Sequence, residues 1–306
     1  MFNISLSVAL FLAFVYSILL FASIFIYLKK EQLKKHKELK DRIFSWWVII
    51  SIITFALISN FYISIIFFAA LSFIALREYF QVTPTRKSDN VPIILAYLAI
   101  LVQYYFVATA WYGMFIIFIP VYMYFLIAAA MVIMGNTTDF LKSIAIIQWG
   151  MMITIFNISH LAFLLNLPKN HSMGIGLILF ILFTTQFNDV AQYVWGKKLG
   201  KHKIIPKVSP NKTWQGFLGG MLTTTILSVI LGLWLTPISA VFAIIIGILI
   251  STTGFLGDVT ISAIKRDLAI KDTGSLLPGH GGILDRIDSL TFTAPLFFHL
   301  IRYFYY

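Results

Sequence analysis

The sequence contains no cysteine, and charged residues make up only 11% of its 306 positions. The first absence excludes disulfide bonds and thiolate metal sites. The second value is far below the roughly 25% of charged residues in a typical soluble domain. Hydrophobic residues reach 59%, and the mean hydropathy is +0.90. Together these values predict an all-α, polytopic integral membrane protein.

Acidic residues are also few: 12 Asp and Glu stand against 23 Lys and Arg, a formal net charge of +11. In a soluble protein this excess would suggest nucleic acid. Here the basic residues gather in loops, as they do on the cytoplasmic side of membrane proteins, so we expect no nucleic-acid partner. Seven lie in 29–42, three in 77–87, six in 197–212 and four in 265–286. The first cluster is also suited to contact anionic lipid headgroups.

Runs of roughly 17–25 apolar residues mark the membrane-spanning helices that we expect. They lie near 5–28, 91–110, 113–134, 143–165, 173–195, 215–235, 239–257 and 289–306. The apolar stretch 44–76 is too long for one span and short for two. A pair of helices that breaks near Ser59-Asn60 would put every basic cluster on one side, which gives about nine or ten spans with the N-terminus outside.

The first apolar run, 4–28, is too long for a signal-peptide core and has no basic residue before it. We therefore expect a retained first helix, and the absence of a targeting presequence favours a bacterial inner (cytoplasmic) membrane. Polar constellations are concentrated in the second half of the chain. We expect scaffold helices in 1–180 and a catalytic transmembrane region in 181–306, with signature loops that face the cytoplasm.

Residues 257–288 form a polar, glycine-punctuated run in this apolar chain. The run combines aspartates, among them Asp258, Asp285 and Asp288, with basic residues and His280. Charged side chains near the hydrocarbon are costly and mark functional sites by default. Carboxylates can hold a divalent metal and cations can hold phosphate, so the run predicts chemistry on phosphates.

Asp258 begins this run at the end of an apolar span. If a helix continues through it, Ser262 and Lys265 lie at i+4 and i+7 on the same face. Asp189 lies near the end of another apolar stretch and is a candidate because an acid at that depth is costly. The structural alternatives are a helix-end acid with a snorkelling lysine, and an acid paired with a nearby lysine.

Asp285 and Asp288 are spaced i, i+3, so one helical face would present both carboxylates. Mg²⁺ typically takes one or two carboxylates and completes its shell with water and phosphate oxygens. Two acids at a helix N-terminus, favoured by the macrodipole, are the structural alternative. The preceding loop, Pro278-Gly-His-Gly-Gly282, would let backbone N–H groups approach an anion, with His280 contacting phosphate or a metal-bound water.

The segment Ser209-Pro-Asn-Lys-Thr213 precedes the expected span 215–235. Two hydroxyls and the Lys212 ammonium at a helix start suit a triphosphate, whereas helix capping by Ser209 or Thr213 is equally consistent with the pattern. The spacing of a P-loop is absent, which excludes a P-loop NTPase.

The two polar regions resemble the phosphatidate cytidylyltransferase family, whose members are also called CDP-diacylglycerol synthases. The family's C-terminal pattern is matched by Ser262, Lys265, Arg266, Lys271, Asp272, Pro278, His280, Gly281, Gly282, Asp285, Arg286 and Asp288. Upstream, the segments 189–193, 200–202 and 209–216 are similar to further elements of the family. One departure is Gln192, where the family usually has alanine.

The resemblance implies a Mg²⁺-dependent transfer of CMP from CTP to phosphatidate in the bilayer, giving CDP-diacylglycerol and pyrophosphate. It implies Mg²⁺ ligands at Asp258, Asp285 and Asp288, with Asp189 as a further ligand or a nearby acid. The implied catalytic or phosphate-binding residues are Ser209, Lys212, Thr213, Lys265, Arg266, Lys271, His280 and Arg286. The alternatives are another lipid phosphate as acceptor, which Gln192 would mark, and an anion transporter; a homodimer is left open.

Overall fold

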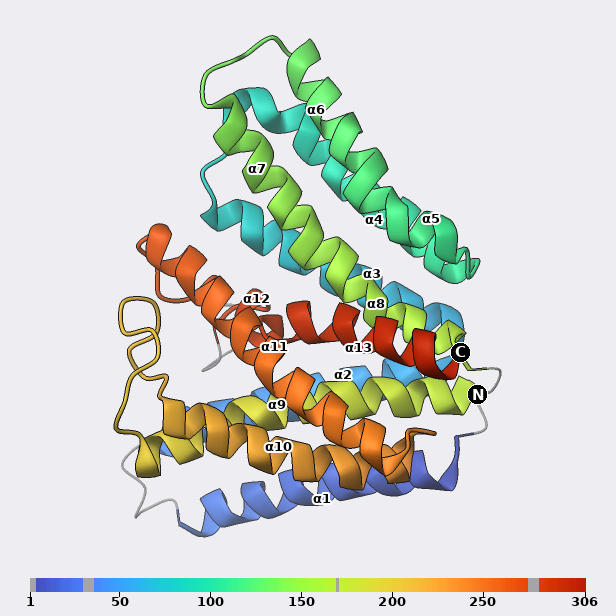
Figure 1. Ribbon diagram of the computed structural model, residues 1–306, viewed down its shortest axis with the longest axis vertical. Helices are drawn as coiled ribbons and strands as arrows, with labels where there is room; N and C mark the ends of the chain where they lie inside the picture. The colour runs from blue at the N-terminus through green and yellow to red at the C-terminus, as the bar shows by residue number, and fades with distance from the viewer. Residues whose placement is uncertain (1–3, 30–35, 169–170, 275–280) are drawn as a thin grey trace.

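The protein is a bundle of long helices, shown by a computed structural model that describes residues 4–29, 36–168, 171–274 and 281–306 (Figure 1). Within these ranges no β-strand forms, and extended pairing is limited to one isolated bridge between Lys203 and Thr213. The expected all-α membrane architecture is confirmed.

Most of the helices follow one another with short connections, and the two long ones are 200–213 and 268–283. In chain order they are α1 (Leu6–Leu28), α2 (His36–Ser59), α3 (Phe61–Val82), η1 (Lys87–Asp89), α4 (Asn90–Ala108), α5 (Tyr112–Ile117), η2 (Phe118–Met123), α6 (Tyr124–Ile133), α7 (Phe140–Met151), η3 (Met152–Phe156), α8 (Asn157–Phe163), η4 (Leu164–Asn166), α9 (His171–Leu199), α10 (Trp214–Leu235), α11 (Ala240–Asp267), α12 (Leu284–Ile287) and α13 (Leu290–Tyr305). The segments η2 and η3 are π-helical turns inside otherwise continuous rods.

Nine helices in the described ranges are long and apolar enough to cross a membrane. The stretch 44–76 is indeed a pair, because α2 ends at Ser59 and α3 begins at Phe61. Asn60 makes the break: its extended backbone interrupts the helix and its side chain accepts the Ile63 N–H at 2.9 Å. The last helix, α13, has 16 residues and a length of about 24 Å, shorter than the ~30 Å hydrocarbon core.

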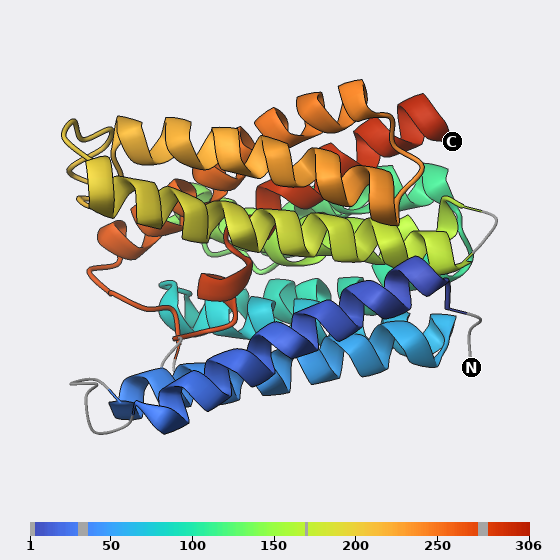
Figure 2. The same cartoon turned by 90° about the horizontal axis from the view of Figure 1, so that it is seen from below.

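The described start of α2, the α3–α4 and α9–α10 connections and the end of α11, which carry basic residues, lie at one end of the bundle, on the left in Figures 1 and 2. The start of α1 and the end of α13 lie at the other end. The Arg86 guanidinium donates to the Asn136 carbonyl at 3.3 Å and so joins the α3–α4 and α6–α7 connections. The Arg266 guanidinium donates to the Val208 carbonyl at 3.2 Å and joins the end of α11 to the loop before α10. This end of the bundle is called the basic end below.

Small residues allow α9, α10 and α11 to pack closely. A Cβ on Gly216 would lie 2.7 Å from the Gln192 carbonyl oxygen, and one on Gly220 would lie 2.4 Å from the Gln192 Cγ. Close backbone approach is the usual way in which helices associate in lipid, where no hydrophobic force drives them together. Helix α13 packs against α8, α9 and α11, so it joins this group to the helices of the first half.

Single cysteines test the shared basic end. Lys37→Cys, Lys87→Cys and Lys201→Cys should be labelled by an impermeant thiol reagent from one side of the membrane, and Trp111→Cys from the other, because all four side chains are exposed at these ends. The native chain has no cysteine, so the background is clean. Labelling of positions 37 and 87 from opposite sides would show that the α2–α3 pair does not cross twice.

Candidate active site

Asp258 lies on α11, which runs unbroken through the basic end to Asp267. The Ser262 hydroxyl, one turn later, donates to Asp258 Oδ1 at 3.3 Å, as the i+4 spacing predicts. The Lys212 ammonium, from the loop before α10, contacts Asp258 Oδ2 at 2.5 Å. The expected face of α11 is therefore present, and Asp258 is paired with a lysine from another part of the chain.

Asp189 and Asp288 approach Asp258 from two other elements. Ser289 joins them, because its hydroxyl donates to Asp189 Oδ1 at 3.1 Å and its N–H donates to Asp288 Oδ1 at 2.8 Å. Burial and the negative charges of Asp258 and Asp189 raise the pKa of Asp288 well above its usual range. We call Asp189, Asp258 and Asp288 the acid cluster.

Gly257 allows this approach. A Cβ at that position would lie 2.5 Å from the Asp288 carbonyl oxygen and 3.1 Å from the Ser289 Cα. Because these neighbours are backbone atoms, they cannot turn aside as a flexible side chain would. The glycine thus lets α11 touch the backbone between α12 and α13, which brings Asp258 and Asp288 together.

Lys212 supplies the positive charge at the acid cluster. Burial alone would lower the pKa of its ammonium, but the charges of Asp258 and Asp189 outweigh that effect, so its pKa is raised. The Lys212 ammonium also lies 3.4 Å from Gln192 Oε1. Gln192, the residue that departs from the family pattern, therefore contacts the lysine that we expect to bind phosphate.

Asp285 belongs to a separate group of contacts. Its carboxylate accepts the Lys265 ammonium at 2.7 Å, the Thr273 N–H at 2.8 Å and the Gly282 N–H at 3.1 Å. Burial would raise the pKa of this carboxyl, but the Lys265 ion pair and the backbone hydrogen bonds lower it. Asp285 and Asp288 thus have different partners, although they are only three residues apart.

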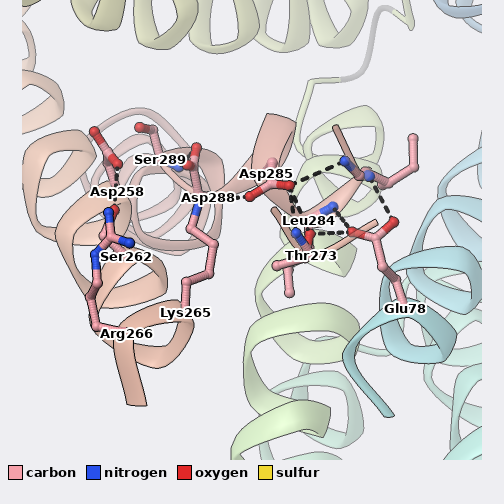
Figure 3. A network of polar contacts seen from close by, with 12 residues as sticks. Glu78, Asp258, Ser262, Lys265, Arg266, Thr273, Leu284, Asp285, Asp288 and Ser289 are labelled. Atoms are coloured by element: carbon pink, nitrogen blue, oxygen red, sulfur yellow. Dashed lines mark hydrogen bonds and ion pairs between the residues drawn. The ribbon is translucent and has the colours of Figure 1, made fainter. Parts of the chain in front are cut away.

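Glu78 is a functional candidate that the sequence did not reveal. It accepts the N–H groups of Ile283 at 2.8 Å and Leu284 at 3.0 Å, and the Thr273 hydroxyl donates to it (Figure 3). The expected span ended at residue 76, whereas α3 continues to Val82 and buries Glu78. The available signal was a lone acid that follows an apolar run with no helix breaker before Pro84.

The remaining candidate residues differ in their exposure and in their hydrogen-bond partners. The buried Arg286 Nε has no hydrogen-bond partner in the described part of the chain, so this guanidinium has capacity for an anion. Lys271 is exposed, and Arg266 donates to the Val208 carbonyl. Thr213 is the N-cap of α10 and accepts the Gly216 N–H at 3.1 Å, which is the capping alternative. Ser209 is half-buried nearby, and His280 lies outside the described residues.

A divalent cation fits the acid cluster chemically. No three His, Asp or Glu side chains in the described ranges are arranged to surround a metal ion. Mg²⁺ does not require such a cage, because it is usually held by one or two carboxylates plus water and substrate phosphates. Three carboxylates beside one lysine leave an excess of negative charge, and among the described residues the Asp288 carboxylate accepts a hydrogen bond from the Ser289 N–H alone.

Comparison with known proteins gives a consistent result. Residues 40–304 match the profile of the cytidylyltransferase family. The uncharacterized protein YnbB of Escherichia coli is 44% identical over 271 residues, which cover 88% of this chain and 89% of YnbB. Phosphatidate cytidylyltransferases of Staphylococcus saprophyticus and Bacillus subtilis are each 41% identical, over 42% and 43% of this chain. The chain matches about half the length of these two enzymes, 50% and 49%.

Asp285→Asn should destabilise the protein by on the order of 2 kcal/mol at pH 7, because it leaves the half-buried Lys265 ammonium without its partner. A carboxyl whose pKa is lowered in the folded state adds stability above its unfolded value, ~3.9, and loses it as pH falls through the lower folded value. Thermal unfolding should thus show a constant difference between wild type and variant from pH 8 to pH 5, which closes below about pH 4.

Asp267→Asn is the matched control, since Asp267 is exposed at the end of the same helix. It should leave the unfolding midpoint unchanged. An equal loss of stability in both variants would show that the Asp285–Lys265 ion pair does not stabilise the protein more than an exposed carboxylate does.

Proposed function

Because the chain belongs to the cytidylyltransferase family, we propose that this membrane nucleotidyltransferase transfers CMP from CTP to phosphatidate, giving CDP-diacylglycerol and pyrophosphate. The observation that carries the proposal is the acid cluster at the basic end, where carboxylates from three elements act on one another's charge and Lys212 pairs with Asp258. That arrangement suits a reaction between two phosphate compounds. The relatives of known name provide the substrate identities.

In this proposal a phosphate oxygen of phosphatidate attacks the α-phosphorus of CTP. The bond from that phosphorus to the bridging oxygen of the β-phosphate breaks, and pyrophosphate leaves with the electron pair. No covalent intermediate on the protein is needed. The contribution of the protein is therefore to position the two phosphates and to neutralise their charge.

Asp258 and Asp288 are the proposed Mg²⁺ ligands, with Asp189 as a further ligand or neighbouring acid. Bound Mg²⁺ would neutralise phosphate charge and orient the reacting groups. Asp285, which the sequence groups with them, is engaged by Lys265, Thr273 and Gly282, and in this proposal it fixes the loop rather than the metal.

Lys212 and Arg286 are the proposed contacts for nucleotide and lipid phosphates, with Lys265, Arg266 and Lys271 as further cations at the same end. Arg286 is favoured because its buried Nε has no described partner. We propose that this end faces the cytoplasm of a bacterial inner membrane, since basic loops are retained on that side and CTP is present there.

A transferase that acts on another lipid phosphate monoester is the second candidate. YnbB, which carries no assigned activity in its name, resembles this chain over nearly its whole length, whereas the phosphatidate enzymes match about half. The acid cluster and Lys212 would serve any such acceptor, because they contact groups common to lipid phosphates. The Gln192 departure lies beside Lys212, close to the proposed phosphate contacts.

Purified protein should convert CTP and phosphatidate to a liponucleotide in the presence of Mg²⁺. CTP should be preferred to UTP by at least tens-fold, because two unmatched hydrogen bonds at the base edge cost ~1–3 kcal/mol each. Thin-layer chromatography of labelled products measures both. Equal turnover of UTP would contradict the nucleotide assignment, and activity on a different lipid phosphate alone would favour the second candidate.

Asp288→Asn should separate function from stability. Loss of a metal-binding carboxylate should reduce kcat by at least about 100-fold, or ~2.7 kcal/mol of barrier. The thermal midpoint should hold or rise, because the change removes a carboxylate that Asp258 and Asp189 repel. Near-normal turnover at saturating Mg²⁺ would show that Asp288 is not a metal ligand.

A further inference from the structure

Glu78 connects the first half of the chain to the segment that carries Asp285. Among the hydrogen bonds of the described residues, it provides the side-chain contacts between α3 and the loop before α12, with Thr273 lying 195 positions away in the sequence. Its side chain is buried, with 5% exposed. No cation of the described residues lies within ion-pair distance of its carboxylate.

Two carboxylates accept hydrogen bonds from three consecutive backbone N–H groups at the start of α12. The Gly282 N–H donates to Asp285, and the N–H groups of Ile283 and Leu284 donate to Glu78. These donors have no partner within their own helix, since the first N–H groups of a helix are never satisfied internally.

The Thr273 hydroxyl lies between the same two carboxylates. It contacts Glu78 Oε1 and is 3.0 Å from Asp285 Oδ2 (Figure 3). A hydroxyl has one proton and donates to one acceptor at a time, so here it serves Glu78 while the Thr273 N–H serves Asp285. Glu78, Thr273, Asp285 and Lys265 therefore form one connected chain of polar contacts from α3 to α11.

Glycines on both sides leave room for the Glu78 carboxylate. A Cβ on Gly282 would lie 1.9 Å from Glu78 Oε1, and one on Gly274 would lie 2.9 Å from its carboxyl carbon. The expected anion-binding loop, 278–282, lies largely outside the described residues, so that expectation stays a prediction. Directly after it, the N–H groups of Ile283 and Leu284 bind a carboxylate that the protein itself supplies.

We propose that Glu78 is a positioning residue for the reaction, because it holds the start of α12 and thereby fixes the backbone that carries Asp288 into the acid cluster. This inference rests on the proposed function. A buried carboxylate that loses its hydrogen-bond donors destabilises the folded state. The position of the start of α12 and the burial of Glu78 therefore stabilise each other. Helix α3 is thus a necessary part of the catalytic end.

Glu78→Gln tests the proposal, since it keeps the size of the side chain but replaces one acceptor oxygen by an NH₂ group that faces backbone donors. We expect kcat to fall at least about tenfold and the half-saturating Mg²⁺ concentration to rise several-fold. The KM for CTP should change less than about twofold, because Lys212 lies on a different loop. Glu78→Asp, which keeps the charge but is one methylene shorter, should be intermediate. Asp267→Asn should behave as wild type.

Hydrogen exchange provides a readout that does not depend on the activity assigned above. The amides of 282–284 should be protected in the wild type and exchange at least about 100-fold faster in Glu78→Gln, with α10 unchanged. If Glu78→Gln fails to insert, Thr273→Val, which removes one donor to Glu78, should shift the same quantities in the same direction by less. Unchanged protection in Glu78→Gln, or unchanged kcat and Mg²⁺ dependence in an active enzyme, would overturn the proposal.

If the wild type transfers no cytidylyl group, the proposed function fails while the exchange experiment still decides whether Glu78 holds the loop. If the wild type is active and Glu78→Gln loses loop protection without a change in kcat or Mg²⁺ dependence, the contact is structural and the positioning role is wrong.

Discussion

The arrangement at the basic end depends on how five buried or partly buried acidic side chains find hydrogen-bond donors and cations. Glu78 takes backbone N–H groups, Asp285 takes Lys265 and backbone N–H groups, Asp258 takes Lys212, and Asp189 takes the Ser289 hydroxyl. Asp288 accepts one backbone N–H of the described residues and is repelled by two neighbouring carboxylates. A buried charge is tolerated only when it is compensated, so the cluster is balanced best when a further cation joins it.

Glycines make these contacts possible because they remove the atom that would keep the backbones apart. Gly257 lets α11 meet the backbone of Asp288, and Gly282 lets the start of α12 lie against Glu78. Both positions lie within the polar, glycine-punctuated run 257–288. One glycine thus lets a helix touch the backbone between α12 and α13, and the other leaves room for a carboxylate beside backbone donors.

The sequence was sufficient for features that depend on neighbouring residues. Hydropathy located the spans, and helical spacing placed Ser262 beside Asp258. The expectation that all basic loops lie on one side of the membrane predicted the break at Ser59-Asn60. It did not reveal Glu78, because a contact across nearly 200 residues depends on helix packing. The i, i+3 spacing likewise suggested equal roles for Asp285 and Asp288, whereas packing gives them different partners.

The contacts of Glu78 also bear on how the chain is divided. An expected boundary near residue 180 separates scaffold helices from catalytic helices, yet α3 contacts the start of α12 and α8 packs against α13. In the described part of the first half, the buried acidic side chains are those of Glu78 and Asp89. Where one such side chain is buried and accepts three donors from the signature loop, its cost must be offset by those contacts. Glu78, although it lies in α3, therefore functions structurally as part of the region around the start of α12.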